Sequence, residues 1–210
     1  GDGGEADPVE AVRCFSEAAQ RGDPWGRFYL AGCRFDGRGV ERDPLTAESD
    51  LRRAAEAGLP AAMGALGRRL LGGDGVERDP SQGIHWLRLA ADGGDVPAMV
   101  CLSDAYEEGL GVAADAAQAR AWLEAAVTAG DAHAAYVLSA YLFAGRGGPV
   151  DAVRGQDLRR RAAEAGEADA QVDLGRACLA AGDEAGAAIW YRRAADQGNA
   201  RGLHAWGWGL

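Results

Sequence analysis

Residues 98–130 read AMVCLSDAYEEGLGVAADAAQARAWLEAAVTAG, and this stretch decides the fold. Leu102 and Tyr106 follow the 3.6-residue period of a helix with one buried face. The run Gly109-Leu-Gly111-Val112 interrupts that helix with two glycines, which favours a tight turn. Asp115 then precedes a second apolar-periodic segment that ends at the final glycine. The stretch therefore predicts two helices joined by a glycine-rich turn.

The same pattern recurs along the whole chain. A small-small-x-x-x-Gly signature ends at six glycines, which are spaced by 36, 36, 36, 36 and 32 residues: Gly22, Gly58, Gly94, Gly130, Gly166 and Gly198. Glycine-rich turns recur at the same period, at Gly37–Val40, Gly73–Val76, Gly109–Val112 and Gly145–Gly148. The fifth turn is shortened to Ala181-Gly182-Asp183, which accounts for the 32-residue interval. A fixed period of this length is typical of a repeat architecture.

Capping residues define the ends of the predicted helices. An aspartate follows each of the four longer turns and fits an N-cap position: Asp43, Asp79, Asp115 and Asp151. Pro44 and Pro80 then fit the first helical position, and Gln82 and Gln118 stand where a capping box places its glutamine. The six signature glycines fit the left-handed position that ends a helix.

These signals predict an all-α fold, a right-handed superhelical α-solenoid of antiparallel helix pairs, as one domain over residues 1–210. We expect A helices at about 24–36, 60–72, 96–108, 132–144 and 168–181, and B helices at about 7–20, 44–57, 80–92, 115–129, 150–165 and 183–197. The units are then a half unit at 7–22, full units at about 24–58, 60–94, 96–130, 132–166 and 168–198, and a half unit at 199–210. A leucine row should be buried between neighbouring A helices, at Leu30, Leu66, Leu102, Leu138 and Leu174. Small residues at Ala62, Ala98, Ala134 and Ala170 should let helices approach closely.

Composition excludes several classes of function. The chain contains 22 Arg, no Lys and 32 Asp and Glu, which gives a net charge of −10. Such a balance argues against nucleic acid as a partner, because phosphate binding needs a basic face. No stretch is long and apolar enough to span a membrane. The opening residues 1–8 show no secretory signal pattern, although removal of such a signal stays open.

Residues 102–112 of the quoted stretch, with Ala119-x-x-Trp122 after them, resemble the Sel-one-like repeat (SLR), a relative of the tetratricopeptide repeat. The resemblance covers residues from about 9 to 208. It implies a protein–protein interaction scaffold or adaptor, often bacterial, rather than an enzyme. The aromatic that the family places in the B helix is present as Trp86, Trp122 and Trp190. Cys14, Asp50 and Leu158 replace it elsewhere, and Asp50 predicts a looser or more exposed second unit.

Chemically reactive residues are few and scattered. The glycine turns lack the preceding strand and the Lys-Ser/Thr of phosphate-binding loops, so we interpret them as structural. His85, His133 and His204 lie in different units without metal-ligand spacing, and we expect no metal and no other cofactor. Cys14, Cys33, Cys101 and Cys178 also lie in different units. Reduced thiols, which favour the cytoplasm, are the preferred interpretation, with a long-range disulfide and a periplasmic or secreted location as the alternatives.

The candidate binding site is the concave face that A helices line in related solenoids. Aromatic and arginine side chains supply most of the energy of protein interfaces, so they are preferred there. The alternative for each aromatic is packing between neighbouring A helices. The candidate partner-binding residues are Trp25, Phe28, Phe35, Arg68, Asp104, Glu107, His133, Tyr136, Phe143 and Arg176.

The sequence therefore predicts a non-catalytic scaffold that binds a protein or peptide in its concave face. An immunity-type or regulatory inhibitor of a toxin or enzyme is the alternative, because the negative charge would steer association with a basic partner. A hydrolase or a small-molecule-binding protein is less favoured. Trp206 and Trp208 make the end of the sequence apolar, which predicts either self-association or a longer array.

Overall fold

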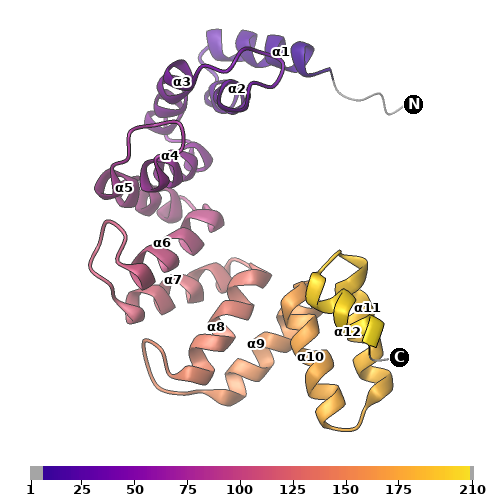
Figure 1. Cartoon of the computed structure of the whole chain (residues 1–210). Coiled ribbons are helices and arrows are strands. Elements are labelled where there is room, and N and C mark those ends of the chain that lie inside the picture. Colours follow the sequence, from indigo (N-terminus) through magenta and orange to yellow (C-terminus); the bar gives the residue numbers. More distant parts are fainter. Residues whose placement is uncertain (1–6, 209–210) are drawn as a thin grey trace. The chain divides into compact units, whose positions relative to one another are not determined.

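The structure, a computed structural model, describes the backbone of residues 7–208 and the side chains of residues 7–207 (Figure 1). Twelve α-helices and no strand occupy this part of the chain. The helices are α1 Pro8–Gln20, α2 Pro24–Asp36, α3 Pro44–Glu56, α4 Pro60–Gly72, α5 Pro80–Asp92, α6 Val96–Glu108, α7 Ala116–Thr128, α8 Ala132–Ala144, α9 Ala152–Glu164, α10 Ala168–Ala180, α11 Glu184–Asp196 and α12 Ala200–Trp208. The predicted all-α class is confirmed, and the predicted helix bounds are correct to within two residues. We call α2, α4, α6, α8, α10 and α12 the A helices and the other six the B helices.

The chain divides into two compact units, Gly1–Ala114 and Asp115–Leu210. The N-terminal unit holds α1 to α6, and the C-terminal unit holds α7 to α12. The expectation of one continuous domain stays a prediction.

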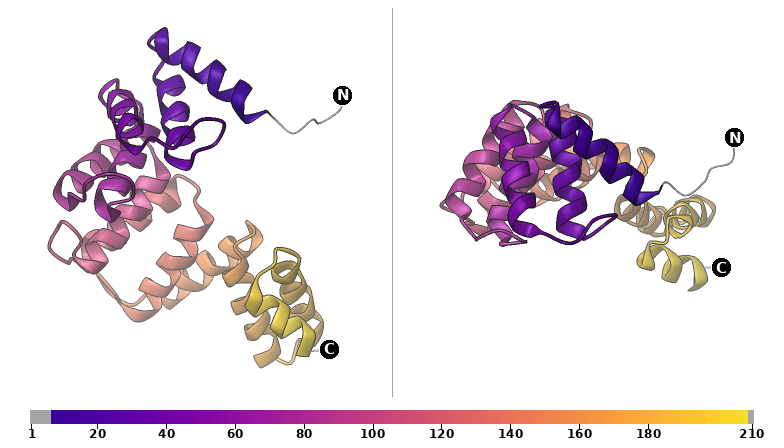
Figure 2. Two further views of the ribbon diagram at one scale, coloured as in Figure 1. Left: turned by 45° about the horizontal axis from the view of Figure 1, so that its top comes forward. Right: turned by 90° about the horizontal axis from the view of Figure 1, so that it is seen from above.

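In the N-terminal unit, each helix packs antiparallel against the next one in sequence (Figures 1 and 2). Leu66 and Leu102 are completely buried and Leu30 almost so, which confirms the predicted leucine row in this unit. Ala62 and Ala98 are also completely buried. Their small side chains let α4 and α6 approach the neighbouring helices, as predicted.

The C-terminal unit repeats this packing from α7 to α12, and α10 also contacts α12. Leu138 is completely buried, whereas Leu174 is only partly buried because it borders a cavity between α9 and α10. A cluster of buried side chains joins α10 and α11, and it consists of Val172, Ala187, Tyr191 and Ala194. A Cβ at Gly175 would lie 2.6 Å from the Tyr191 ring, so the absence of a side chain there admits the tyrosine.

The predicted caps are confirmed. The carboxylates of Asp43, Asp79, Asp115 and Asp151 each accept a hydrogen bond from a backbone N–H in the first turn of the following helix. The Gln82 side chain departs from a capping box, because its amide N–H donates to the Asp79 carboxylate at 2.8 Å, whereas a capping-box glutamine accepts from the backbone N–H of the N-cap residue. The Asp79 N–H instead donates to Leu70 O. The hydrogen bonds from the backbone N–H of Gln82 and, next, from its side-chain amide lower the pKa of Asp79.

The signature glycines end the B helices in the left-handed conformation, as predicted. After α1, Gly22 has φ of 88°, and its backbone N–H donates to Ala19 O. The backbone N–H of Asp23 donates to Ala18 O at 3.1 Å. This pair of bonds is a Schellman motif. Gly147, in the turn after α8, has a second requirement: a Cβ there would lie 2.1 Å from Ala116 O. The turn therefore packs directly on the start of α7, which is a structural role and supports no phosphate site.

Asp50 corrects one expectation. Its side chain is buried rather than loose, and it pairs with Arg34 and, at 4.0 Å, with Arg27, both from α2. Two guanidinium groups compensate the desolvation of the carboxylate, so an acidic residue replaces the usual aromatic without opening the unit.

Candidate functional site

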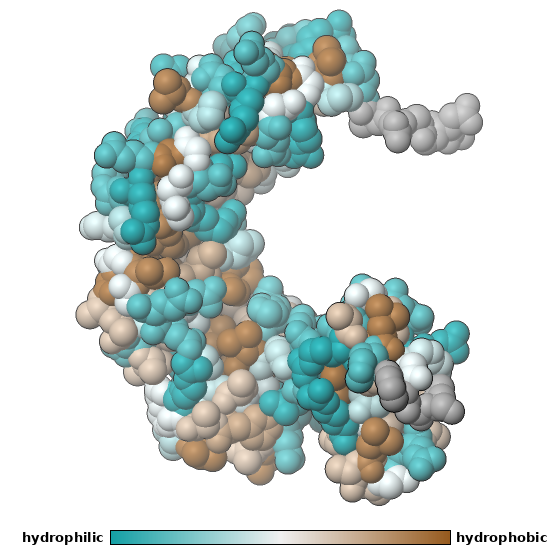
Figure 3. All heavy atoms as spheres, in the orientation of Figure 1, coloured by the Kyte–Doolittle hydropathy of each residue, from teal (hydrophilic) through white to brown (hydrophobic). Residues whose placement is uncertain are grey.

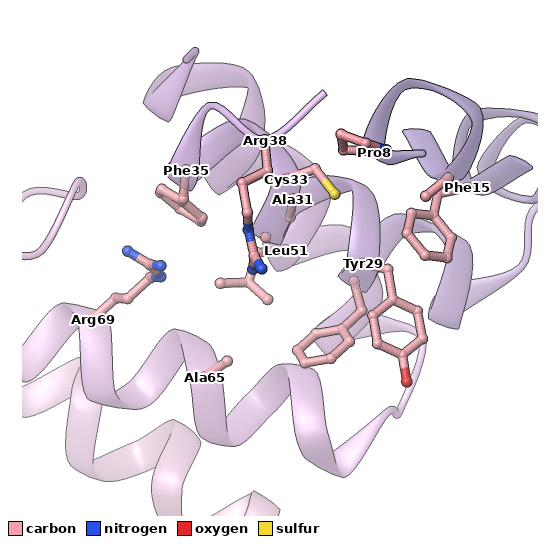
Figure 4. A pocket seen from close by; sticks show the side chains of 13 residues that line it. Pro8, Phe15, Tyr29, Ala31, Cys33, Phe35, Arg38, Leu51, Ala65 and Arg69 are labelled. Carbon is pink, nitrogen blue, oxygen red and sulfur yellow. The ribbon is translucent and has the colours of Figure 1, made fainter. Parts of the chain in front are cut away.

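An apolar pocket of about 440 Å³ lies in the N-terminal unit, where α1, α2 and α4 meet above the core (Figure 4). Most of the visible surface of this unit is hydrophilic in Figure 3, so an apolar hollow is distinctive. Its lining combines aromatic and aliphatic side chains with two guanidinium groups, and no carboxylate is among the lining residues. The side chains that decide its chemistry are Phe15, Phe28, Tyr29, Phe35, Leu51, Arg38 and Arg69. We call it the N-terminal pocket.

Stacked aromatic rings form one side of the N-terminal pocket. Tyr29 stacks on Phe15 with ring centroids 5.1 Å apart and on Trp25 with centroids 5.7 Å apart. Phe28 meets both Trp25 and Tyr29 edge-on, at 5.8 and 5.3 Å. Trp25 and Tyr29 nevertheless remain 46% exposed. We call these four residues the aromatic cluster. Fixed rings with large exposed areas can bind a partner at little cost in conformational entropy.

Arginine side chains form the opposite side. The Arg69 guanidinium lies 3.6 Å from the centroid of the Phe35 ring and donates through Nη1 to the backbone and carboxylate oxygens of Asp74. Arg38 donates through Nη2 to the Asp36 carboxylate at 2.8 Å. In Figure 4 both side chains extend toward the middle of the pocket, facing Phe15 and Tyr29 across it. The pocket therefore has an aromatic side and a cationic side.

The predicted residues of the N-terminal unit divide between surface and core. Trp25 belongs to the exposed part of the aromatic cluster, and Phe28 is half-buried at the pocket wall. Phe35 is only 5% exposed, so the core-packing alternative describes it better, although its ring also borders the pocket. Asp104 and Glu107 are exposed on α6 and do not border the pocket.

Arg68 is exposed on α4, and its Nη1 lies 3.9 Å from the carboxylate of Asp95. Burial raises the pKa of Asp95, while hydrogen bonding from Ala98 N–H and the Arg68 charge act in the other direction. Burial likewise raises the pKa of the nearby Cys101 thiol. Arg68 thus stands beside a partly desolvated carboxylate at the start of α6.

In the C-terminal unit, Asp173 on α10 brings several charged side chains together. Its carboxylate accepts a hydrogen bond from the Tyr136 hydroxyl at 3.3 Å and lies within 4 Å of three arginines: Arg159 at 3.6 Å, Arg176 at 3.9 Å and Arg201 at 3.3 Å. Burial, and next the Asp173 charge, raise the pKa of Tyr136. The predicted residues Tyr136 and Arg176 are therefore brought together around a carboxylate that the sequence did not single out.

The two other predicted residues of this unit are His133 and Phe143, and Phe143 lines the same cavity as Asp173. His133 is exposed, with Nδ1 3.5 Å from the Glu167 carboxylate. Phe143 is half-buried under the Arg159 guanidinium, 4.6 Å from its ring centroid, beside a cavity of about 680 Å³. Because acidic and basic side chains both line that cavity, it lacks the uniform charge of the N-terminal pocket.

Phe15, Tyr29, Arg38 and Arg69 are functional candidates that the sequence did not indicate. Tyr29 lies one helical turn after Trp25, a spacing that places both on one face of α2. Arg69 has no comparable local signal, because its contact with Phe35 joins residues of two different helices. The helix that carries Phe15 lay outside the predicted A helices.

The described part of the chain holds no metal-binding cluster. No group of three His, Cys, Asp or Glu side chains there could hold a metal ion. All four cysteines are free thiols; Cys14 is exposed and the other three are partly buried. Among the described helices, none has the length and apolarity that a membrane span requires.

At the end of the chain, Trp206 is partly buried against the cluster of α10 and α11, while Leu203 is 53% exposed. The side chain of Trp208 lies outside the described residues. Self-association through this apolar end stays a prediction.

Comparison with known proteins agrees with this architecture. The Sel1 repeat family model matches six segments, at residues 1–23, 26–59, 60–95, 96–131, 132–167 and 168–199. No functionally curated protein matches the chain with significant similarity.

Solved structures share the fold. The crystal structure of c5321, a protective antigen present in uropathogenic Escherichia coli strains displaying an SLR fold, matches with a TM-score of 0.81 and 31% identity over 95% of this chain, which spans 44% of that protein. A Sel1 repeat protein from Oxalobacter formigenes matches with a TM-score of 0.80 and 28% identity, over 96% of this chain and 91% of that one. The immunity protein Pa5087 from Pseudomonas aeruginosa, at 19% identity and a TM-score of 0.59 over 93% of this chain and 77% of its own, shares the fold alone. Repeats over nearly the whole length and two such structural matches show that this chain belongs to the Sel1 repeat family.

Proposed function

We propose that this protein is a non-catalytic scaffold that binds a partner protein or peptide through its A helices. Sel1 repeat proteins are generally protein-interaction scaffolds, and the family is typically non-catalytic. The observation that carries the proposal for this chain is the N-terminal pocket with its exposed aromatic cluster. The A-helix candidates of the C-terminal unit, Tyr136 and Arg176, form a second contact region in the proposal.

The exposure of the aromatic cluster supports binding over a purely structural role. Trp25 and Tyr29 each leave about half of their surface in water, although apolar burial contributes about 25 cal/mol per Å². Stacking fixes both rings before any partner arrives, so little side-chain entropy remains to be lost on binding. Exposed, preorganised aromatics of this kind dominate the binding energy of protein interfaces.

A site-specific photo-crosslinker tests the proposal in cells. Replacing Trp25 with p-benzoylphenylalanine should yield a discrete crosslinked partner, which mass spectrometry then identifies. The same amino acid at Ile189, which is 56% exposed on the B helix α11, is the matched control. Crosslinking of the same partner from Ile189 with equal yield would contradict binding through the A helices.

Charge reversal provides a second test with the identified partner. Arg68→Glu together with Arg176→Glu should weaken partner binding while the helical content in circular dichroism stays unchanged. Both side chains are exposed and their nearest carboxylates lie 3.9 Å away, so neither supports the fold strongly. Unchanged partner affinity in this variant would remove both arginines from the interface.

An immunity-type or regulatory inhibitor is the second candidate, and the charge distribution favours it. The N-terminal unit holds 12 Arg against 20 Asp and Glu, whereas the C-terminal unit holds 10 against 12. A strongly acidic unit would accelerate association with a basic toxin or enzyme. An association rate that falls steeply with added salt supports this candidate, and a salt-independent rate would exclude it.

A hydrolase or a small-molecule-binding protein is the least supported function. Such an activity would need titratable groups that converge in one pocket, and the N-terminal pocket holds two arginines without a base. Turnover in an activity screen that a single substitution abolishes would establish an enzyme instead.

A further inference from the structure

We infer that the N-terminal pocket binds a segment of a partner protein in which a bulky apolar side chain stands next to an aspartate or glutamate. This inference rests on the proposed function and specifies the chemistry of the partner. It follows from three properties of the pocket: its apolar surface, the sign of its charge and the placement of the two.

The apolar surface requires an apolar guest. The pocket volume of about 440 Å³ lies in the range of about 300–1,000 Å³ that is usual for sites that enclose a ligand. Leu51 and Ala65 line it between the two sides, and Phe15 and Tyr29 form one wall. A phenylalanine, tryptophan or leucine side chain placed there would gain both hydrophobic and aromatic contacts.

The charge of the pocket requires an anion beside that guest. Arg38 and Arg69 line the pocket, whereas no Asp or Glu does so, although the chain as a whole carries a charge of −10. A basic segment would therefore find repulsion and no counter-charge. A carboxylate would find two guanidinium groups, which bind it with short charge-assisted hydrogen bonds.

The present carboxylate partners of these arginines do not compete strongly. Asp36 and Asp74 are 46% and 76% exposed, and neither lines the pocket. The ion pair of Arg38 is exposed at both partners and that of Arg69 is exposed at its carboxylate, so water and salt screen both pairs and each contributes little. Both hydrogen bonds described for Arg69 also come from Nη1, so Nη2 and Nε can donate to a guest while Phe35 keeps the guanidinium in place.

The arrangement sets the order of the groups in the guest. The aromatic side and the cationic side face each other across the pocket in Figure 4. A single extended segment meets both when its apolar anchor and its carboxylate belong to neighbouring residues. The pocket is thus complementary to an acid-flanked apolar motif rather than to an apolar or acidic segment alone.

Selection from a random peptide library displayed on phage tests the inference with the full chain as the target. Enriched peptides should share a Phe, Trp or Leu beside an Asp or Glu, and a synthetic enriched peptide should bind with a measurable Kd in calorimetry. Replacing its acidic residue by the amide should weaken binding about tenfold or more. Enrichment of basic peptides, of apolar peptides without an acid, or of none would overturn the inference.

Protein variants locate the binding. Arg38→Gln and Arg69→Gln together should weaken the acidic peptide at least about tenfold and leave the amide peptide unchanged. Arg38→Gln alone should show part of this loss, and because its side chain is 73% exposed, it leaves the fold intact. Arg53→Gln, on the exposed surface of α3, is the matched control for the lost charge. An acidic peptide that binds the double variant and the Arg53→Gln control with equal affinity would also overturn the inference.

The outcome separates this inference from the proposed function. If the natural partner crosslinks at Trp25 but its bound segment carries no acid, the scaffold function stands and the acid-flanked motif falls. If acid-flanked peptides bind and no partner crosslinks at Trp25, the pocket chemistry stands and the scaffold function falls.

Discussion

Substituting Gly147 by alanine should destabilise the C-terminal unit more than the same substitution at Gly182. Both glycines lie in turns of that unit with positive φ, 66° at Gly147 and 79° at Gly182. A Cβ at Gly182 would meet nothing within 4 Å, whereas one at Gly147 would lie 2.1 Å from Ala116 O. The pair therefore separates the effect of backbone conformation from that of close packing.

The expected magnitudes follow from this geometry. Left-handed backbone costs a residue with a side chain about 1–2 kcal/mol, and the reduced freedom of the unfolded alanine offsets part of it. We expect Gly182→Ala to lower the free energy of unfolding by about 1 kcal/mol. At Gly147 the carbonyl of Ala116 would also have to move by about 1 Å or more to reach an ordinary contact distance, which adds about 1–3 kcal/mol.

Urea denaturation followed by far-ultraviolet circular dichroism measures both variants against the parent protein. Gly147→Ala should unfold at a clearly lower urea concentration than Gly182→Ala, with the same dependence of the free energy on urea. Equal destabilisation by the two substitutions would refute the assignment of Gly147 to a packing contact with α7.

Three further outcomes are expected. Asp50→Ala should lower the free energy of unfolding by about 2–3 kcal/mol, because it leaves Arg34 half-buried without its carboxylate. The double variant Asp50→Leu with Arg34→Met should stay within about 1 kcal/mol of the parent. Urea denaturation of both variants checks this, and equal losses of stability would contradict it. Asp79→Asn should destabilise the protein at pH 7, because the lowered pKa of Asp79 gives stability that is complete above its ordinary value of 3.8 and is lost as the pH falls through the folded pKa. Thermal unfolding at a series of pH values checks this, and a difference from the parent that does not shrink as the pH falls below 3.8 would contradict it. Asp95→Asn should instead stabilise the protein at pH 7, because the raised pKa of Asp95 gives stability that is complete only below 3.8 and is lost as the pH rises through the folded pKa. Asparagine also keeps the helix cap. Thermal unfolding from pH 3 to 7 checks this, and a gain in stability that does not disappear in acid would contradict it.

The fold could be predicted closely because its determinants are local and periodic. An N-cap such as Asp115 or a helix-ending glycine such as Gly22 acts within its own few residues, and the fixed period repeats the same signal along the chain. Leu66 and Leu102 are buried for the same reason, because each repeat packs its leucine against the neighbouring repeat. Leu174 stays partly exposed beside a cavity that the repeat period does not encode.

The candidate site was only partly predictable because it depends on contacts between different helices. Trp25 and Phe28 follow from their positions on one helix. Arg69 acquires its role from the Phe35 ring of another helix, and no spacing within a single helix indicates that contact. Asp50 was misinterpreted for the same reason, since Arg34, sixteen residues earlier, makes its burial possible.

Filling the N-terminal pocket from within tests the central claim most directly. Gly32 lines the pocket on α2 with ordinary helical φ, and a Cβ there would meet nothing within 4 Å, so Gly32→Leu should fold while its side chain occupies the pocket. Gly72→Leu, at an equally open helical glycine away from the pocket, is the matched control. The partner identified by crosslinking is titrated into each variant in a calorimeter. Its Kd should be at least about tenfold weaker for Gly32→Leu and unchanged for Gly72→Leu. Equal affinities for the two variants would contradict the claim that this protein holds its partner at the N-terminal pocket.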